Sequence, residues 1–582
     1  KGFYQGGDLK GLTQRLDYIK GLGTTAIWMA PLFENKPVQG VGEAASAGYH
    51  GYWITDFTRV DPHFGTNDDL KKLIRAAHAK GMKVFFDVIT NHSRVPAAVD
   101  ADGLPYTPVV PATERNAKKP AWLNDPTMYH NRGDSTFVGE SGLYGDHTGL
   151  DDLWTERPEV VRGLAEIYET WVRDFDIDGF RVDTVKNVNM EFWTQWATAL
   201  DAYAKKRGRE DFLIFGEILS SDPSVTAPYV TEGRLDATLD FPLQQAVRDV
   251  ASLGRPASAL ADVFAEDYRY TTDKANAYEQ VTFLGNHDMG RIGSFLEQDN
   301  PNASDAELVR RATLANELMF LSRGNPVVYA GDEQGFTGAG GDKDARQTLF
   351  ASKVPDYLDD DQLGTGRTHA TDAYDTTHPL YRSIAALSKL TREHPALRDG
   401  VQIQRHTDTA GAGVHATSRI DPRRRTEYLV AVNNATTPET VTLTTGTSRA
   451  RFAPLYGDAG PVRSGADRRI TLTVPALSSV VLQADRPLDV PHAAPSVRLT
   501  APPAGATGTV EVTAAPGAGE LNRVVFAAQV GDGPWQTLGS ADHAPYKVTH
   551  RIPAGTPGGT PVRYKAVVVD PRGRTASALA AT

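Results

Sequence analysis

The chain has no cysteine among its 582 residues. That absence excludes disulfide bridges, zinc–thiolate sites and thiol nucleophiles. Long hydrophobic runs are absent too, since no stretch approaches the roughly 20 apolar residues that cross a membrane. Neither a charged nor an apolar signal segment follows Lys1, so we expect that any signal peptide has been removed or lies upstream. We predict no membrane partner.

Basic charge is also scarce, because 61 Lys and Arg residues against 72 Asp and Glu residues give a net charge of −11. Nucleic-acid binding needs a concentrated basic surface, so we expect a neutral ligand and no nucleic acid. Apolar residues make up 40% and charged residues 23%, which is typical of a soluble globular protein. The length predicts about three or four domains.

A repeating β/α pattern extends from residue 9 to about residue 395. Short apolar runs alternate with amphipathic segments, which predicts a parallel sheet with helices between its strands. One predicted helix is capped by Asn67 or Asp68 and stops near Gly81, and another runs from Pro158 to Phe175. The predicted strands are residues 25–32, 83–89, 179–182, 212–215, 237–241, 281–284 and 326–329.

These seven strands predict an α/β fold, a (β/α)8 TIM barrel formed by residues 1–90 and 152–397. A closed barrel needs eight β/α units, so we expect its first strand upstream of Lys1. Residues 91–151, rich in Pro, Gly, Asn and Asp, are far longer than an ordinary loop and predict an inserted domain B after the third strand.

Beyond residue 400 the pattern changes to strand-like runs with Gly and Pro turns. We predict a β-sandwich domain C at residues 398–486, a proline-rich linker at residues 485–495, and an immunoglobulin-like β-sandwich at residues 495–582. The aromatic residues Trp535 and Tyr546 of this last module are expected in its core, which favours a spacer over a sugar-binding module.

Polar residues end four of the predicted barrel strands, where catalytic groups of such barrels lie. Asp87, Asn91 and His92 follow the third strand, and Arg181 and Asp183 end the fourth. Glu217 ends the fifth strand. The seventh strand is followed by Asn286, His287 and Asp288. We expect all of these side chains to converge on one mouth.

Two carboxyl groups with separated pKa values are what glycoside cleavage requires. Arg181 lies two residues from Asp183 on one strand face and is expected to keep that carboxylate ionised, as a nucleophile must be. Glu217 has no basic residue near it in sequence and would face two carboxylates, which predicts a raised pKa and a general acid. A single strand-end Asp is usually a cap or an ion-pair partner, but the four segments together favour catalysis.

These four segments resemble the four short conserved regions of the α-amylase family of glycoside hydrolases. The resemblance extends to residues 50–53, where Tyr52 matches a tyrosine that stacks on the sugar, and to residues 329–334. It implies a retaining double displacement with Asp183 as nucleophile, Glu217 as acid/base and Asp288 as transition-state stabiliser. The substrate contacts that it implies are His50, Tyr52, Trp53, Asp87, His92, Arg181, Lys186, Asn187, Asn286 and His287.

The same resemblance implies a structural Ca²⁺ between the barrel and the insert. Asn91 and Asp152 match side-chain ligands of the family, and Asn187 would supply a backbone carbonyl where the family often has His. Oxygen ligands suit this ion. The alternative reading of residues 151–152 is a solvated turn or a helix cap.

The leading interpretation is a monomeric, secreted enzyme that hydrolyses α-1,4 bonds inside starch, glycogen or related α-glucan chains. An α-1,6-active or pullulan-cleaving hydrolase and a transglycosylase of the same family are the alternatives, and Asn187 on the acceptor side is the main reason to keep them. A glucan-binding protein without catalysis is disfavoured because Asp183, Glu217 and Asp288 are all present. Extracellular location is expected because polymeric glucans do not cross membranes.

Overall fold

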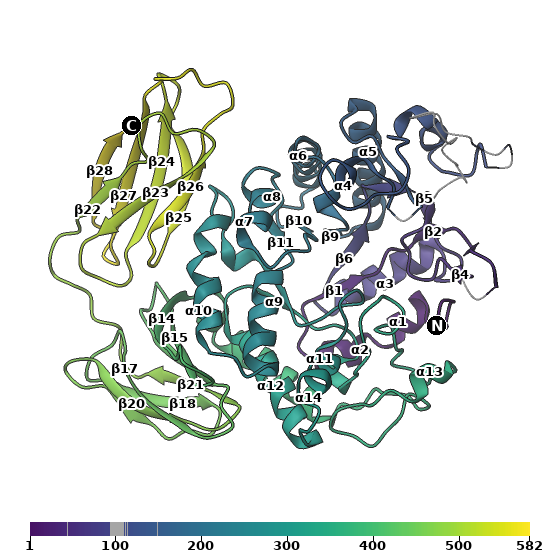
Figure 1. The fold of residues 1–582 in the computed structure, drawn as a ribbon. Coiled ribbons are helices and arrows are strands. Elements are labelled where there is room, and N and C mark those ends of the chain that lie inside the picture. Colours follow the sequence, from purple (N-terminus) through teal and green to yellow (C-terminus); the bar gives the residue numbers. More distant parts are fainter. Residues whose placement is uncertain (43–44, 94–109, 111, 113, 148) are drawn as a thin grey trace.

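The computed structural model describes residues 1–42, 45–93, 110, 112, 114–147 and 149–582. Figure 1 shows three parts: a region of parallel strands surrounded by helices, and two antiparallel regions that contain β14–β21 and β22–β28. They follow one another along the chain in the predicted order. Part of the predicted insert, residues 94–109, lies outside the described residues.

A parallel ladder forms the centre of the first part, with the order β1-β6-β9-β10-β11 and a separate pair β12-β13. A parallel bridge between Leu239 and Val281 connects the two sheets. Seven strands therefore follow one another side by side in sequence order, as predicted, while closure into an eight-stranded barrel stays a prediction. The strands are β1 (Ala26–Met29), β6 (Lys83–Val88), β9 (Gly179–Val182), β10 (Leu213–Gly216), β11 (Ala237–Thr238), β12 (Val281–Phe283) and β13 (Asn325–Val327).

The prediction of a strand through residue 241 is wrong at its end. Phe241 begins helix α9 (Phe241–Val247), because the Asp240 side chain accepts the Leu243 N–H at 3.0 Å and Pro242 occupies the first turn. An unpredicted antiparallel pair, β2 (Phe33–Asn35) with β5 (Ile54–Val60), lies between β1 and the next helix. Most of β5 is buried, and its sequence, although rich in β-branched residues, does not alternate apolar and polar side chains.

Helix α3 (Asn67–Ala79) already includes Asn67 and Asp68, the two residues expected to cap it. Its cap is Thr66, which forms a reciprocal capping box with Asp69, and not Asn67 or Asp68. Helix α5 (Pro158–Phe175) has the predicted bounds. The other longer helices are α1 (Leu9–Gln14), α2 (Leu16–Gly21), α6 (Met190–Lys206), α10 (Ser258–Ala265), α11 (Ile292–Asp299), α12 (Asp305–Leu321) and α14 (Pro379–Glu393); four-residue helices are α4 (Ser141–Tyr144), α7 (Pro223–Thr226), α8 (Pro228–Thr231), α13 (Pro355–Leu358) and α15 (Ala396–Asp399).

The insert leaves and rejoins the barrel region at one place. Strand β7 (His92–Ser93) pairs with β8 (Asp151–Asp152), so that His92 lies opposite Asp152. Inside the insert, Lys118 is buried and its ammonium contacts Asp151 Oδ2 at 2.7 Å and the Tyr129 hydroxyl at 3.0 Å. The insert thus begins and ends beside the residues that follow β6.

Two antiparallel regions complete the chain. The first has a six-stranded sheet of order β14-β15-β16-β21-β18-β19 and a pair β17-β20, and the second has sheets of order β22-β23-β26 and β25-β24-β27-β28. Each has its own apolar core. The bounds are β14 (Val401–Thr407), β15 (Val414–Ile420), β16 (Glu427–Asn433), β17 (Glu439–Thr444), β18 (Arg451–Tyr456), β19 (Val462–Arg463), β20 (Arg469–Val474), β21 (Ser478–Ala484), β22 (Val497–Thr500), β23 (Thr509–Pro516), β24 (Arg523–Val530), β25 (Gln536–Ala541), β26 (Lys547–Arg551), β27 (Val562–Val569) and β28 (Thr575–Ala581).

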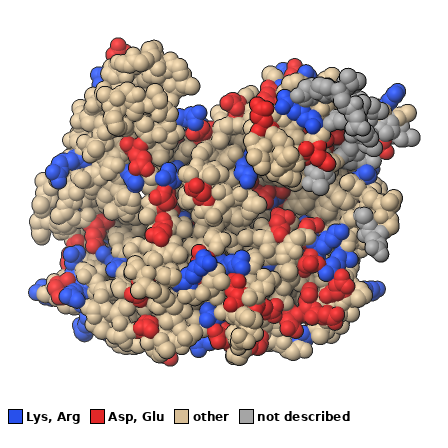
Figure 2. Space-filling model, viewed as in Figure 1, with Lys and Arg blue, Asp and Glu red and all other residues tan. Residues whose placement is uncertain are grey.

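The last module contacts the barrel region directly. Tyr278 Oη lies 3.3 Å from Asp542 Oδ2, Tyr268 donates to Glu511, and Arg551 pairs with Glu232. The proline-rich segment between β21 and β22 has no helix or strand, as predicted for a linker, yet its Leu488 is buried. On the face in Figure 2, acidic and basic side chains are separated by broad uncharged areas, and several acidic side chains lie close together at the lower right. Among the described residues, no helix has the length and apolar character that crossing a membrane requires.

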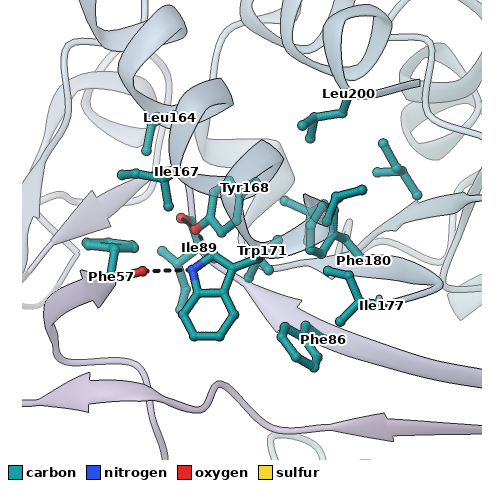
Figure 3. Packing of buried hydrophobic residues seen from close by; sticks show 14 of the residues in the cluster. Phe57, Phe86, Ile89, Leu164, Ile167, Tyr168, Trp171, Ile177, Phe180 and Leu200 are labelled. Atoms are coloured by element: carbon teal, nitrogen blue, oxygen red, sulfur yellow. Dashed lines mark hydrogen bonds between the residues drawn. The ribbon is translucent and has the colours of Figure 1, made fainter. Parts of the chain in front are cut away.

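The core between the sheet and α5 contains Trp171, whose ring packs on Phe175 and, edge-on, on Phe86 (Figure 3). Its indole N–H donates to the Phe57 carbonyl oxygen at 2.7 Å, which joins α5 to β5. Trp171 is 1% exposed. Aromatic packing and one buried hydrogen bond therefore hold the helix against the strands that carry the polar site.

We expect Trp171→Phe to lower the free energy of unfolding by about 1–3 kcal/mol, because a buried carbonyl loses its donor and the smaller ring leaves a void. Urea unfolding followed by far-ultraviolet circular dichroism measures the change. The matched control is Trp535→Phe, since Trp535 is 43% exposed, and the expectation that it lies in the core of the last module is therefore wrong. Equal midpoints for the two variants would contradict this account of the core.

Candidate active site

The fourth and third predicted barrel strands, β9 and β6, bring Arg181 beside Asp87. The two residues are register partners in the parallel pair, and Phe215 of β10 lies opposite Arg181 on its other side. Asp183 follows β9 directly and Glu217 follows β10 directly. Because parallel strands end at one edge of the sheet, these four side chains meet there.

The Arg181 guanidinium contacts all three carboxyl groups. Nη1 lies 2.8 Å and 3.0 Å from the two Asp87 oxygens and 2.8 Å from Asp183 Oδ1, and Nη2 lies 3.0 Å from Glu217 Oε2. The Arg181 side chain is fully buried and packs over the Trp28 ring, with 5.5 Å from Cζ to the ring centroid. Glu217 therefore has a basic neighbour, which corrects the expectation drawn from its position in sequence.

Glu217 nevertheless has a raised pKa, as predicted. Burial is the largest cause, the Arg181 guanidinium opposes it, and the Asp183 carboxylate adds to it. The Thr184 N–H donates to Glu217 Oε2 at 3.1 Å and fixes the direction of the carboxyl group. The predicted direction of the shift is confirmed, but its main cause is burial and not the neighbouring carboxylates.

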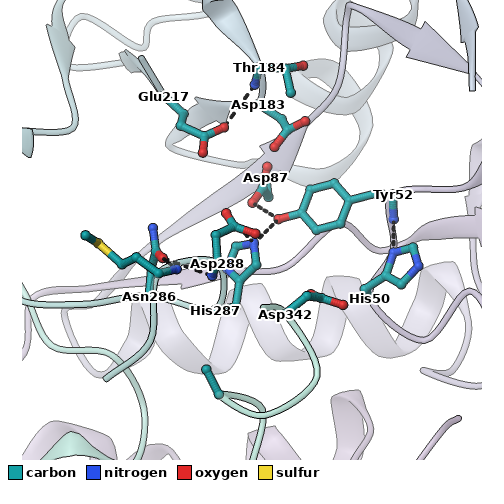
Figure 4. Close-up of polar contacts among 12 residues, drawn as sticks. His50, Tyr52, Asp87, Asp183, Thr184, Glu217, Asn286, His287, Asp288 and Asp342 are labelled. Atoms are coloured by element: carbon teal, nitrogen blue, oxygen red, sulfur yellow. Dashed lines mark hydrogen bonds and ion pairs between the residues drawn. The ribbon is translucent and has the colours of Figure 1, made fainter. Parts of the chain in front are cut away.

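Tyr52 joins the β6 side of the site to the turn after β12 (Figure 4). Its hydroxyl donates to Asp87 Oδ2 at 2.9 Å and lies 3.2 Å from His287 Nε2, so Nε2–H of His287 is the donor to Tyr52. Burial lowers the pKa of His287 well below its ordinary value, so the ring is neutral. In this tautomer the single N–H of the ring is engaged with Tyr52, and Nδ1 is an acceptor.

Asp288 faces this cluster from the opposite side. Its side chain is 53% exposed, and its Oδ2 lies 3.3 Å from His287 Nε2. Partial burial and the charge of Glu217 raise the pKa of Asp288. The Asn286 side chain accepts the Asp288 N–H at 3.0 Å and the Met289 N–H at 2.9 Å, which fixes the turn. Asn286 therefore shapes the backbone and does not face the carboxylates.

The segment before Tyr52 is constrained by Gly51. Its φ is +91°, and a Cβ there would lie 2.2 Å from the Pro31 carbonyl oxygen, so only glycine fits. This turn lets the Tyr52 N–H donate to His50 Nδ1 at 3.0 Å. Trp53 packs edge-on against His50 with 4.6 Å between ring centroids, and its backbone N–H donates to Asn35 Oδ1 at 2.5 Å.

The remaining predicted contacts lie around this centre. His92 is buried beside His147, with 5.4 Å between ring centroids, and burial lowers its pKa to about 3. Lys186 is exposed and its ammonium donates to the Leu219 carbonyl at 3.3 Å. The Asn187 amide donates to the Gly142 carbonyl in the insert at 2.8 Å.

The three predicted calcium ligands lie close together. The Asn91 amide oxygen is 3.1 Å from the Asn187 carbonyl oxygen and 3.3 Å from Asp152 Oδ1. Three oxygens in this arrangement repel one another unless the amide turns through 180° and donates, or a cation lies between them. A different group spaced for a metal among the described residues, His287, Asp288 and Asp342, belongs to the carboxylate site.

Asp342 is a site residue that the sequence did not reveal. It lies beside Asp288 and His287 in Figure 4, accepts from the Tyr49 hydroxyl at 2.9 Å and accepts from Arg346 Nε at 2.7 Å. It follows no strand directly, so no apolar run in the sequence points to it. The glycine-rich stretch of residues 338–341 before it is the sequence signal that would have drawn attention to this loop.

Comparison with known proteins agrees with this geometry. A family model described as the α-amylase catalytic domain matches residues 3–400. The chain belongs to the α-amylase family of glycoside hydrolases. That family was the one indicated by the four strand-end segments.

Individual members of the α-amylase family extend the comparison. An α-amylase of Streptomyces lividans is 64% identical over 616 aligned residues, which cover 99% of this chain and 67% of that relative. A cyclomaltodextrin glucanotransferase of Geobacillus stearothermophilus is 30% identical, with 69% of this chain and 51% of its own length covered. The crystal structure of the Geobacillus thermoleovorans α-amylase with acarbose superposes with a TM-score of 0.64 at 29% identity, covering 83% of this chain and 93% of that one.

Proposed function

We propose that this α-amylase family member is an endo-acting hydrolase of α-1,4-glucosidic bonds in starch, glycogen or related α-glucans, with retention of the anomeric configuration. The observation that carries the proposal is the single Arg181 guanidinium in contact with Asp87, Asp183 and Glu217, with Asp288 opposite. The name of the Streptomyces lividans relative, α-amylase, supports the same activity.

In the first step, Asp183 attacks the anomeric carbon while Glu217 gives its proton to the leaving glycosidic oxygen. The bond to the leaving sugar breaks as the bond to Asp183 forms, and Glu217 is left as a carboxylate. In the second step, Glu217 takes a proton from water, whose oxygen attacks the same carbon and releases Asp183. Two inversions at one carbon give net retention.

The other residues hold the sugar and its charge. Asp288 stabilises the oxocarbenium-like state, and His287, His92 and Tyr52 contact the sugar in the cleaved subsite. Arg181 and Asp87 orient the nucleophile, and His50 and Trp53 shape the wall that carries Tyr52. Lys186 and Asn187 lie on the acceptor side.

A transglycosylase or an α-1,6-active hydrolase is the second candidate. The similarity to a cyclomaltodextrin glucanotransferase supports transfer, because both reactions share the covalent intermediate and differ in the acceptor. Hydrolysis is favoured because the exposed Lys186 and Leu219 leave the acceptor side open to water. A binding protein without catalysis is disfavoured because Asp183, Glu217 and Asp288 are all present and lie around one site.

We also propose a Ca²⁺ ion held by Asn91, Asp152 and the Asn187 carbonyl, which would tie the insert to the barrel. The clustering of their oxygens supports it. Secretion and a monomeric state are proposed as well, since a polymeric substrate is encountered outside the cell and the site is built from one chain.

The defining experiment is product analysis of soluble starch, pullulan and maltotetraose by chromatography and anomeric NMR. We expect α-anomeric maltooligosaccharides from starch, and no activity from Glu217→Gln because no acid remains to protonate the leaving oxygen. Pullulan cleavage or longer transfer products would establish the second candidate. Inactivity of the wild type on all three would contradict both.

The alkaline limb of the pH–activity profile should follow the ionisation of Glu217. Its raised pKa keeps this carboxyl group protonated to higher pH, and the first step donates that proton. Activity is present below this pKa and is lost as pH rises through it, above the ordinary glutamate value of about 4.3. In Asp183→Asn the carboxylate that adds to this shift is gone, so Glu217 should ionise at lower pH, which the ¹³C chemical shift of its carboxyl carbon measures. Titration of Glu217 at unchanged or higher pH would refute this coupling.

Removal of calcium should lower the thermal midpoint, because an ion that binds the folded state alone stabilises it by about 3 kcal/mol at 100 times its Kd. Differential scanning fluorimetry with chelator or with added CaCl₂ measures the difference. Asp152→Asn should reduce this difference in thermal midpoint. Asp125→Asn, which removes an exposed carboxylate of the same insert, should leave the difference unchanged. A wild-type midpoint that ignores the chelator would remove the calcium proposal.

A further inference from the structure

Arg291 is a buried arginine near the carboxylate site that the proposed chemistry does not use. It is 1% exposed and lies three positions after Asp288, where it precedes helix α11. Its Nη1 donates to Asp332 Oδ1 and to the Ala330 carbonyl oxygen, each at 2.9 Å, and its Nε donates to Gln347 Oε1 at 2.8 Å. One side chain therefore binds two segments that follow β13.

The backbone around Arg291 is paired with the second of these segments. The Arg291 N–H donates to the Gly338 carbonyl at 3.0 Å, and Gly290 forms an antiparallel bridge with Ala339. Two more bonds run back from this loop, from the Gly341 N–H to the Asp288 carbonyl at 2.9 Å and from the Asp342 N–H to the His287 carbonyl at 3.0 Å. The turn of residues 286–290 and the loop of residues 338–347 thus form one ribbon.

Close backbone contact makes this ribbon sensitive to small shifts. A Cβ at Gly340 would lie 2.9 Å from the Asp288 carbonyl oxygen and 2.7 Å from that of Met289. The same loop carries Asp342, which lies near Asp288 in Figure 4, and Arg346, whose Nε donates to Asp342 Oδ1 at 2.7 Å. Any movement of the loop is therefore transmitted to Asp288 on one side and to Asp342 on the other.

The Arg291 guanidinium is fixed on its faces as well as its edges. Its Cζ lies 4.2 Å from the centroid of the Tyr329 ring and 5.2 Å from that of Phe336. The Tyr329 hydroxyl donates to the Ala345 carbonyl at 2.9 Å, and the Gln347 amide donates to Asp360 Oδ2 at 2.8 Å. Arg291 is thus the point where the Asp288 turn, the end of β13 and the loop of residues 338–347 meet.

We propose that Arg291 is a positioning residue that keeps Asp288 and Asp342 at a fixed separation. Asp288 then keeps its contact with the transition state, and Asp342 keeps its contacts with Tyr49 and Arg346. This inference rests on the proposed hydrolase function. A lysine at position 291 can keep the ion pair with Asp332, but it has no planar fork to bind Gln347 and Ala330 at the same time. The ribbon then loses its fixed place while the buried charge remains paired.

The test compares Arg291→Lys with Arg323→Lys. Arg323 is also 1% exposed and pairs with the buried Asp240 and Asp267, but its partners lie outside the ribbon. On a maltooligosaccharide, at a temperature well below both midpoints, Arg291→Lys should lower kcat about 10- to 100-fold with KM changed less than about threefold. Arg323→Lys should lower the thermal midpoint and leave kcat near the wild-type value.

Hydrogen exchange by mass spectrometry supplies a readout that does not depend on turnover. Arg291→Lys should increase hydrogen exchange in both residues 286–290 and residues 338–347. Arg323→Lys should increase it in neither segment. If Arg291→Lys folds poorly, Gln347→Met removes one contact and should show a smaller change of the same kind. Equal loss of kcat in the two arginine variants, or unchanged exchange in the ribbon, would overturn the proposal. An inactive wild type with the expected exchange pattern would instead reject the proposed function alone.

Discussion

The burial of one guanidinium among three carboxyl groups is the interaction on which the site depends. Arg181 is fully buried, and its charge is compensated only because Asp87, Asp183 and Glu217 surround it. Three ionised carboxylates beside one guanidinium would leave an excess of negative charge in a place poor in water. A proton on one carboxyl group relieves this excess, and burial raises the pKa of both Glu217 and Asp87, that of Asp87 to about 7. The proposed acid, Glu217, and the proposed nucleophile, Asp183, thus depend on one electrostatic constraint.

The sequence could reveal this cluster because the fold converts strand ends into neighbours. Each catalytic side chain ends an apolar run, and parallel strands of sequential order bring those ends together whatever lies between them. The same pattern predicted all seven strands and helix α5. What it could not predict depends on contacts between distant segments: the Glu217–Arg181 pair, the β2–β5 ribbon and the Arg291 contacts. Local chemistry decided two other errors, the Thr66 cap and the helical start at Phe241.

Asp342 shows why loops escape such reasoning. A residue that ends a strand has its direction set by the strand, whereas Asp342 owes its place to a glycine-rich loop that pairs with the turn of Asp288. The pairing requires the two backbones to lie so close that a Cβ at Gly340 does not fit. It also involves the Arg291 guanidinium, which donates to Gln347 of the loop. Neither requirement leaves a periodic signal in the sequence. Only the folded chain brings residues 286–291 and 338–347 together.

The two sides of the cleaved bond are built with unequal rigidity. On one side, the Tyr52 hydroxyl contacts Asp87 and His287, His287 lies 3.3 Å from Asp288, and Asp342 is held by Tyr49 and Arg346. On the acceptor side, Lys186 is exposed, Leu219 is 61% exposed, and Asn187 is held by a carbonyl of the insert. In the proposed mechanism, formation of the covalent intermediate depends on the first side, and transfer to water or to a second sugar depends on the acceptor side. Hydrolysis and transfer can therefore diverge without change in the carboxylate cluster.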